Sequence, residues 1–197
     1  MRKQTTFMSC LALAAISIVF AQVPVVAHDG KHPDAPNPSP NATASQVVGY
    51  TKVSVTYGRP GVKDRAIWGE LVPYNAGDPR PWMGGANGST IITFEEDVTI
   101  DGNAIAAGSY GLFWIPAEDE WTIILNSDSS QFGIMKYTSD KDVLRITARP
   151  EKAEHQEWLR YEFEKTGELT AALYLHWESL KIGFTIEGPD HRTEKDD

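Results

Sequence analysis

Three basic side chains stand close together at the start of a long irregular segment: Arg59, Lys63 and Arg65, with Asp64 among them. Arginine holds carboxylate, sulfate or phosphate groups through its planar guanidinium, so this cluster is a candidate anion site. The alternative is structural, because the same side chains can pair with some of the 27 acidic residues and pin the segment to the fold. Arg59 is the strongest functional candidate, since Pro60 fixes the direction of the chain that leaves it.

The same segment contains Trp68, Tyr74 and Trp82, and predicted strands nearby carry Trp114 and Trp121. Flat aromatic rings stack on sugars in many exported sandwich domains, which is an argument by analogy. The opposing interpretation is that these rings form the hydrophobic underside of the segment, since large aromatics bury most of their area. On that interpretation Trp68 closes one end of the fold, and Arg59 is held by an acidic or backbone partner.

The five histidines form no zinc-enzyme pattern such as His-Glu-x-x-His. If the chain is cleaved after Ala27, however, His28 becomes the amino terminus and offers an amine and an imidazole together, which suits copper. His32 or His176 would complete such a site. Copper binding is thus an alternative to solvated histidines, and no other cofactor is expected.

No motif for covalent catalysis or phosphate binding is present, and the single cysteine, Cys10, lies in the N-terminal apolar run. Tyr174, His176 and Glu178 alternate along one predicted strand, which would place an acid beside a potential base. The same alternation is typical of a solvated strand face, because the residues between them are apolar. We therefore predict no catalytic residues.

The N-terminus has the three-part layout of a secretory signal peptide over residues 1–27. Arg2 and Lys3 precede an uncharged apolar run that is too short to span a membrane, and cleavage after either Ala21 or Ala27 fits the pattern. We expect an exported chain, periplasmic or extracellular, without a membrane span.

Composition divides the rest of the chain into a linker, a domain and a tail. Residues 28–45 hold four prolines and no large apolar residue, which predicts a disordered linker, and residues 188–197 are predicted as a flexible tail. A domain then covers residues 46–187. The formal net charge of −9 argues against nucleic-acid binding, which needs a basic face.

Period-two alternation in residues 53–57, 92–94, 98–100, 144–148, 159–163, 173–177 and 182–186, together with the mainly apolar segments 110–115 and 121–125, predicts about nine short strands. The connections are too short for parallel crossovers, so the fold class is all-β, an antiparallel β-sandwich of jelly-roll-like or barrel-like form. Residues 110–115 are apolar on both faces, which indicates a central strand. Residues 58–90 hold seven glycines, four prolines and two tryptophans, and loops of this length are often functional.

An ordered set of motifs carries a resemblance to a known family: Tyr57-Gly58-Arg59-Pro60, Val62-Lys63-Asp64-Arg65, Ile67-Trp68-Gly69-Glu70-Leu71-Val72-Pro73-Tyr74, Trp82, Gly85-Ala86-Asn87, residues 107–113, residues 120–122 and Gln131-Phe132-Gly133. With these, residues 46–186 resemble the secreted bacterial domain-of-unknown-function family number twenty-nine eleven. Two positions depart from its pattern, Met83 where arginine is common and Asp64 where glycine is common. The resemblance implies an exported all-β domain and no particular reaction.

These features together predict an exported sandwich domain that binds or interacts without catalysis. The alternatives are a carbohydrate-active or other hydrolase with a pocket at residues 58–90, and a copper protein. The partner would be a small molecule, a glycan or a protein. The candidate ligand-binding residues are Arg59, Lys63, Arg65, Trp68, Tyr74, Trp82 and Asn87.

Overall fold

The computed structural model describes residues 36–74, 81–130, 134 and 136–192, so the expected signal peptide lies outside the described part. Ten strands and one short 3-10 helix follow in chain order: β1 Asn41–Val48, β2 Thr51–Gly58, β3 Ile91–Phe94, β4 Val98–Ile100, β5 Asn103–Ile105, β6 Gly108–Ile115, β7 Trp121–Asn126, η1 Ser139–Lys141, β8 Asp142–Ala148, β9 Glu151–Lys165 and β10 Thr170–Glu187.

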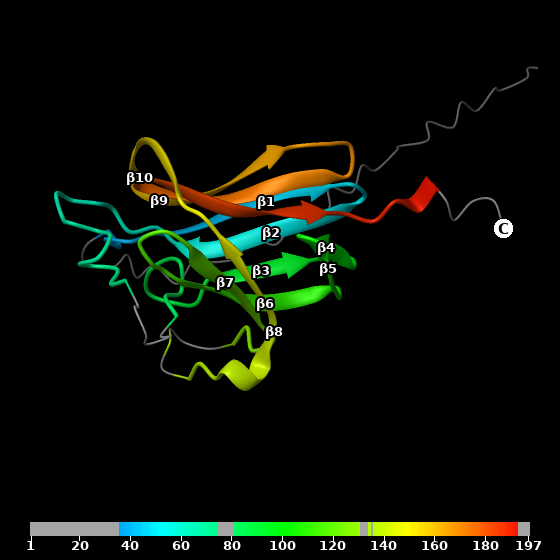
Figure 1. Ribbon diagram of the computed structural model, residues 1–197, viewed down its shortest axis with the longest axis horizontal. Coiled ribbons are helices and arrows are strands. Elements are labelled where there is room, and N and C mark those ends of the chain that lie inside the picture. Colours follow the sequence, from blue (N-terminus) through cyan, green and yellow to red (C-terminus); the bar gives the residue numbers. More distant parts are fainter. Residues whose placement is uncertain (1–35, 75–80, 131–133, 135, 193–197) are drawn as a thin grey trace, which may run out of the picture. The chain divides into compact units, whose positions relative to one another are not determined.

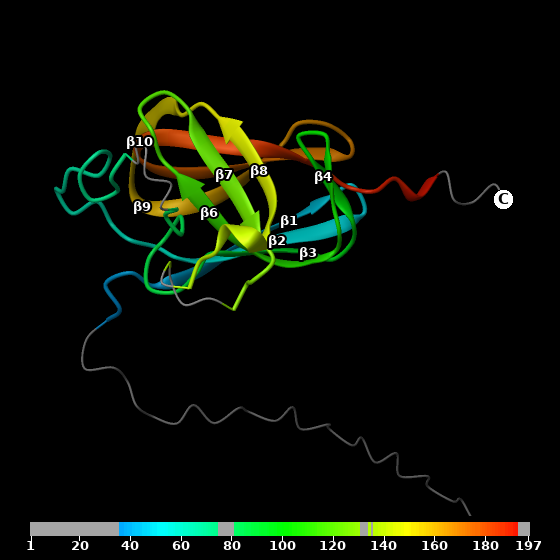
Figure 2. The ribbon, with the colours of Figure 1, turned by 60° about the horizontal axis from the view of Figure 1, so that its bottom comes forward.

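The strands form two sheets whose pairings are all antiparallel. One sheet has six strands in the order β1-β2-β3-β6-β7-β8, and the other has four in the order β5-β4-β10-β9. The main hydrophobic core draws buried side chains from both sheets. The predicted all-β antiparallel sandwich is therefore confirmed. The segment after β2 lies at one end of the strands and the C-terminal segment at the other (Figures 1 and 2).

Side-chain alternation explains the strands next to the site. In β2, Val53, Val55 and Tyr57 are buried while Lys52 and Thr56 face solvent. Strand β6 is buried on both faces and lies inside its sheet, as its sequence predicted. Its alternate residues contribute to the main core and to a second cluster on the outer face, formed by Phe113, Ile115 and Ile124 with Met83 and Tyr137 packed against it.

Three strand assignments differ from the prediction. Strand β1 was missed because its alternate residues are small or polar, and β5 was missed because it has three residues. Residues 173–177 and 182–186 belong to one strand, β10, whose pairing with β9 shifts register on both sides of Glu178. Such bulges allow a strand to bend without ending. Glu178 has a left-handed φ of 54°, which disrupts the alternation that the sequence shows there.

The predicted domain, residues 46–187, is too short at both ends. The linker assignment of residues 28–45 is wrong for residues 41–45, since β1 pairs with β2 from Asn41↔Gly58 onward. The first five residues of the predicted tail, 188–192, are also held by contacts: the Gly188 N–H donates to the Leu169 carbonyl, and Arg192 pairs with Asp190 and Glu168. Backbone pairing and ion pairs order these short polar stretches, which composition alone assigns to coil.

The long segment after β2 is docked by short backbone ladders at two places. The Val62 N–H donates to the Glu157 carbonyl at 2.8 Å, and the Leu159 N–H donates to the Pro60 carbonyl at 3.0 Å. Further on, Trp82 and Trp114 exchange two backbone hydrogen bonds of 2.6 and 2.8 Å. The segment therefore extends the edge of β9 first and a free stretch of β6 later.

A buried chain of hydrogen bonds fixes the segment between the sheets. Trp114 Nε1 donates to Tyr161 Oη at 3.0 Å, and that hydroxyl donates to the Gly84 carbonyl at 3.0 Å. A Cβ at Gly84 would lie 2.3 Å from Tyr161 Oη, and Gly84 has a φ of +60°, so only glycine fits there. Burial raises the pKa of Tyr161 far above its usual value, which keeps the hydroxyl protonated as the donor.

We expect Tyr161→Phe to lower the free energy of unfolding by about 1–3 kcal/mol, because it leaves the buried Trp114 N–H without its acceptor and leaves the Gly84 carbonyl with the longer bond of 3.4 Å from Thr90 Oγ1. Urea unfolding followed by fluorescence measures this effect. Tyr110→Phe is the matched control, since it removes an exposed hydrogen bond to the Ala106 carbonyl. Equal losses in the two variants would contradict a special role for the buried hydroxyl.

Candidate functional site

The three basic residues at the start of the segment bind backbone carbonyls, and each uses different ones. Arg59 Nε donates to the Leu159 carbonyl at 2.9 Å, and Lys63 Nζ donates to the Pro38 carbonyl at 3.3 Å. Arg65 donates through Nε and Nη2 to the carbonyls of Val62 and Gly61, at 3.0 and 2.6 Å. Arg59 and Lys63 therefore tie the segment to other parts of the chain, and Arg65 braces the turn within it. The side chains bond to carbonyls, which agrees with the backbone partner expected for Arg59 and differs from the acidic partners expected for the cluster.

The turn inside this cluster explains one departure from the family pattern. Lys63 and Asp64 have left-handed φ values of 49° and 56°. Glycine adopts this conformation without steric cost, and aspartate tolerates it better than most residues. Asp64 thus occupies a position where the backbone favours glycine.

Five tryptophans meet beneath the segment. Trp68 makes edge contacts with Trp82, Trp121 and Trp177, with ring centroids 5.9, 5.0 and 5.8 Å apart, and Trp82 stacks on Trp177 at 6.0 Å. Trp114 and Trp121 are fully buried, so neither ring has a face open to a sugar. The predicted packing of Trp68 against the core is confirmed.

Two adjoining hollows open beside this aromatic group. The apolar hollow, of about 290 Å³, is lined by Leu71, Val72, Pro73, Pro81, Trp82, Met83 and Ile134. The Arg65 hollow, of about 250 Å³, is lined by Ser39, Pro60, Arg65, Leu71, Val72, Trp82, Gly85, Ala86 and Trp177. They share Leu71, Val72 and Trp82, so they lie side by side at the same end of the sandwich.

The charge of the lining is opposite to that of the chain. The formal net charge is −9, yet the described lining of both hollows contains no aspartate or glutamate, and its single charged side chain is Arg65. Such a lining favours an apolar or negatively charged guest over a cation.

Trp177 lines the Arg65 hollow, but its polar atom does not reach that space. Its side chain is 1% exposed, and its Nε1 is buried without a hydrogen-bond partner among the described residues. Buried indole N–H groups usually find an acceptor, because an unmet donor is costly in the interior. The residue therefore contributes an aromatic wall to the hollow.

The remaining candidates lie elsewhere. Tyr74 is half-buried and lines neither hollow; desolvation raises its pKa, with smaller contributions from Glu118 and Glu178. Asn87 donates to the Ser39 carbonyl at 2.9 Å and lines a separate polar hollow of about 320 Å³. Of the seven sequence candidates, the structure brings together Arg65 and Trp82 at one hollow, and Trp68 makes an edge contact with Trp82.

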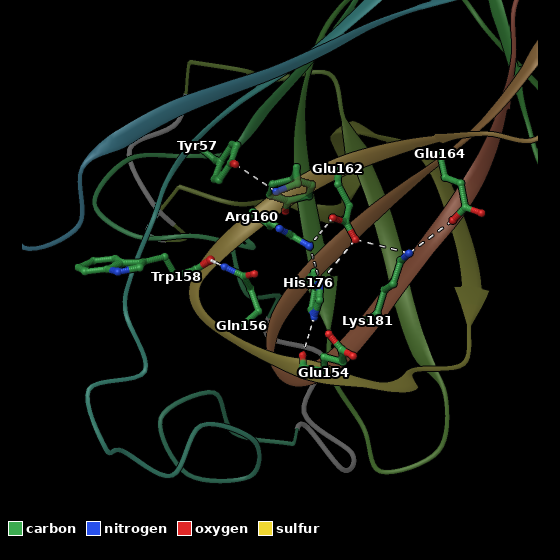
Figure 3. A network of polar contacts seen from close by, with 10 residues as sticks. Tyr57, Glu154, Gln156, Trp158, Arg160, Glu162, Glu164, His176 and Lys181 are labelled. Carbon is green, nitrogen blue, oxygen red and sulfur yellow. Dashed lines mark hydrogen bonds and ion pairs between the residues drawn. The ribbon is translucent and has the colours of Figure 1, made fainter.

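The suspected acid–base trio on β10 is not formed. His176 is buried, and its Nε2 donates to the Glu154 carbonyl at 2.9 Å, while Nδ1 lies 3.3 Å from Arg160 Nη2 and 3.4 Å from Glu162 Oε1. Glu162 in turn pairs with Arg160 at 2.8 Å and Lys181 at 3.4 Å, as Figure 3 shows. Both ring nitrogens are occupied, so the network joins β9 to β10 and offers no free base. The solvated-face interpretation is also wrong for His176.

His28 and His32, the other two histidines of the copper alternative, lie outside the described residues. His176 is described, and both of its ring nitrogens already have partners in this network. Among the residues that the structure describes, no group of three or more potential ligands is arranged to hold a metal ion. The described residues also contain no helix of the length and apolarity needed to cross a membrane.

A family model described as "Protein of unknown function (DUF2911)" matches residues 39–186. The chain belongs to this family. The match begins at Ser39, close to the start of β1, which agrees with the domain boundary seen in the structure. No curated protein and no solved structure matches the chain.

Sequence reasoning missed several lining residues in this family member. Leu71 and Val72 form an apolar pair inside a Gly- and Pro-rich segment, and that pair was the available signal. Met83 was noted as a departure from the family pattern, and it lines the apolar hollow. Trp177 is one of the apolar residues that alternate with Tyr174, His176 and Glu178, but the sequence does not show that a hollow reaches it. Ser39 fell inside the predicted linker.

We expect Trp68→Ala to lower the free energy of unfolding by about 3 kcal/mol, the lower end for a large aromatic, because Trp68 is only partly buried. Arg59→Ala should lower it by about 1 kcal/mol, since the Leu159 carbonyl loses its donor. Chemical unfolding measures both, with the exposed Arg149→Ala as the control. Wild-type stability of Trp68→Ala would show that the segment does not depend on this packing.

Proposed function

We propose that this protein is an exported, non-catalytic binding module that holds a small apolar or amphiphilic molecule at the end of the sandwich. The observation that carries the proposal is the pair of adjoining hollows that share Leu71, Val72 and Trp82. Ligand sites are concave, mostly apolar and equipped with a few polar groups, and this pair has that composition.

Exposed apolar surface at the apolar hollow supports the proposal. Leu71 is 46% exposed and Ile134 is 42% exposed, although both are large apolar residues. Together with Pro73, Pro81 and Met83 they surround a space of about 290 Å³. A cavity of about 150 Å³ holds one benzene ring, so a guest of roughly twice that volume fits here.

The hydrolase alternative requires reacting groups that face a substrate, such as two carboxylates or a nucleophile with its base. The polar side chains in the described lining of the two hollows are Ser39 and Arg65, apart from the indole groups, and no carboxylate or imidazole accompanies them. This composition favours binding over catalysis.

We expect Leu71→Asp to weaken binding of 1-octanol at least tenfold, because a carboxylate would enter the wall shared by both hollows. Tryptophan fluorescence reports the binding, since Trp82 lines both hollows. The wild-type dissociation constant should be on the order of 0.1–1 mM for a ligand of this size.

Val143→Asp is the matched control, because Val143 is 47% exposed and belongs to β8, outside both hollows. It should keep wild-type affinity, and both variants should keep wild-type melting temperatures. The proposal fails if octanol does not bind the wild type up to its solubility limit, or if the two variants bind equally well.

A further inference from the structure

This inference rests on the proposed binding function. The side chains that line the Arg65 hollow indicate the chemical class of the ligand. We propose that the ligand is an anionic amphiphile of the carboxylate type. Its head lies in the Arg65 hollow against Arg65, and its hydrocarbon part lies in the apolar hollow.

The two hollows differ in the way that the two ends of an amphiphile differ. The apolar hollow is lined by aliphatic, proline, methionine and tryptophan side chains, with no charged group among the described residues. The Arg65 hollow adds a guanidinium and a hydroxyl. Leu71 belongs to both hollows and is 46% exposed, so an amphiphile that lies over this side chain would reach the two spaces together.

Arg65 keeps hydrogen-bonding capacity for a guest. Its Nε and Nη2 donate to the carbonyls of Val62 and Gly61, which fixes the plane of the guanidinium. Its Nη1 makes no hydrogen bond with any described residue. A guanidinium held in one orientation loses less entropy when it binds a carboxylate, and its charge discriminates against cations.

The test compares three probes of equal chain length at pH 7: octanoate, 1-octanol and octylamine. Wild-type protein should bind octanoate about tenfold more tightly than octanol, and octylamine most weakly of the three. Arg65→Gln should weaken octanoate binding about fivefold and change octanol binding less than twofold, because the alcohol carries no charge.

Arg149→Gln removes the same charge from an exposed position outside both hollows and should change octanoate affinity less than twofold. Arg65→Gln also loses the hydrogen bonds to the carbonyls of Val62 and Gly61. Unchanged octanol affinity in this variant therefore shows that the hollows keep their shape.

Two failures are distinguishable. If octanol and octylamine bind as tightly as octanoate, or if Arg65→Gln leaves octanoate affinity unchanged, the anionic head is wrong while the binding function stands. If none of the three probes binds, the proposed function falls together with this inference.

Discussion

The structure depends on one buried hydrogen-bonded group, the Tyr161 hydroxyl. It accepts from the Trp114 indole of the six-stranded sheet, belongs to β9 of the four-stranded sheet, and donates to the Gly84 carbonyl of the long segment. Three parts of the chain that are distant in sequence therefore meet at one oxygen. In a water-excluded interior each of these bonds is costly to leave unmade, so the oxygen determines where the segment can lie.

That position gives the site its character. Once Gly84 is held, Trp82 pairs with Trp114 along β6, and its ring stacks on Trp177. The hollows are the space left between this fixed aromatic group and the Leu71–Pro73 stretch. Acidic side chains are abundant on this protein but absent from the described lining. The site is consequently an apolar, weakly basic recess in an acidic molecule, a contrast that attracts anions only at short range because salt screens the rest.

The fold was largely predictable, since period-two alternation identifies the buried face of β2, and short apolar runs identify β6 and β7 as buried strands. Strand β1 was not, because Ala42, Ala44 and Gln46 give it no strong apolar face; pairing with β2 stabilises it. The site was predictable only in part. Residue type identified Arg65 and Trp82, but the role of Arg59 depends on a carbonyl that lies 100 residues further along the chain. Contacts of that range leave no local signal in the sequence.

The pairing of residues 60–62 with residues 157–159 also affects how long the edge of β9 stays unpaired during folding. Strand β9 stands at the edge of its sheet, and the segment after β2 covers part of that edge. The covering strip and the edge are separated by most of the domain, so the loop between them must close before the backbone groups of β9 are paired. Until then those groups are open to strands of other molecules. The edge of β9 is therefore exposed to association with neighbouring molecules until this long loop has closed.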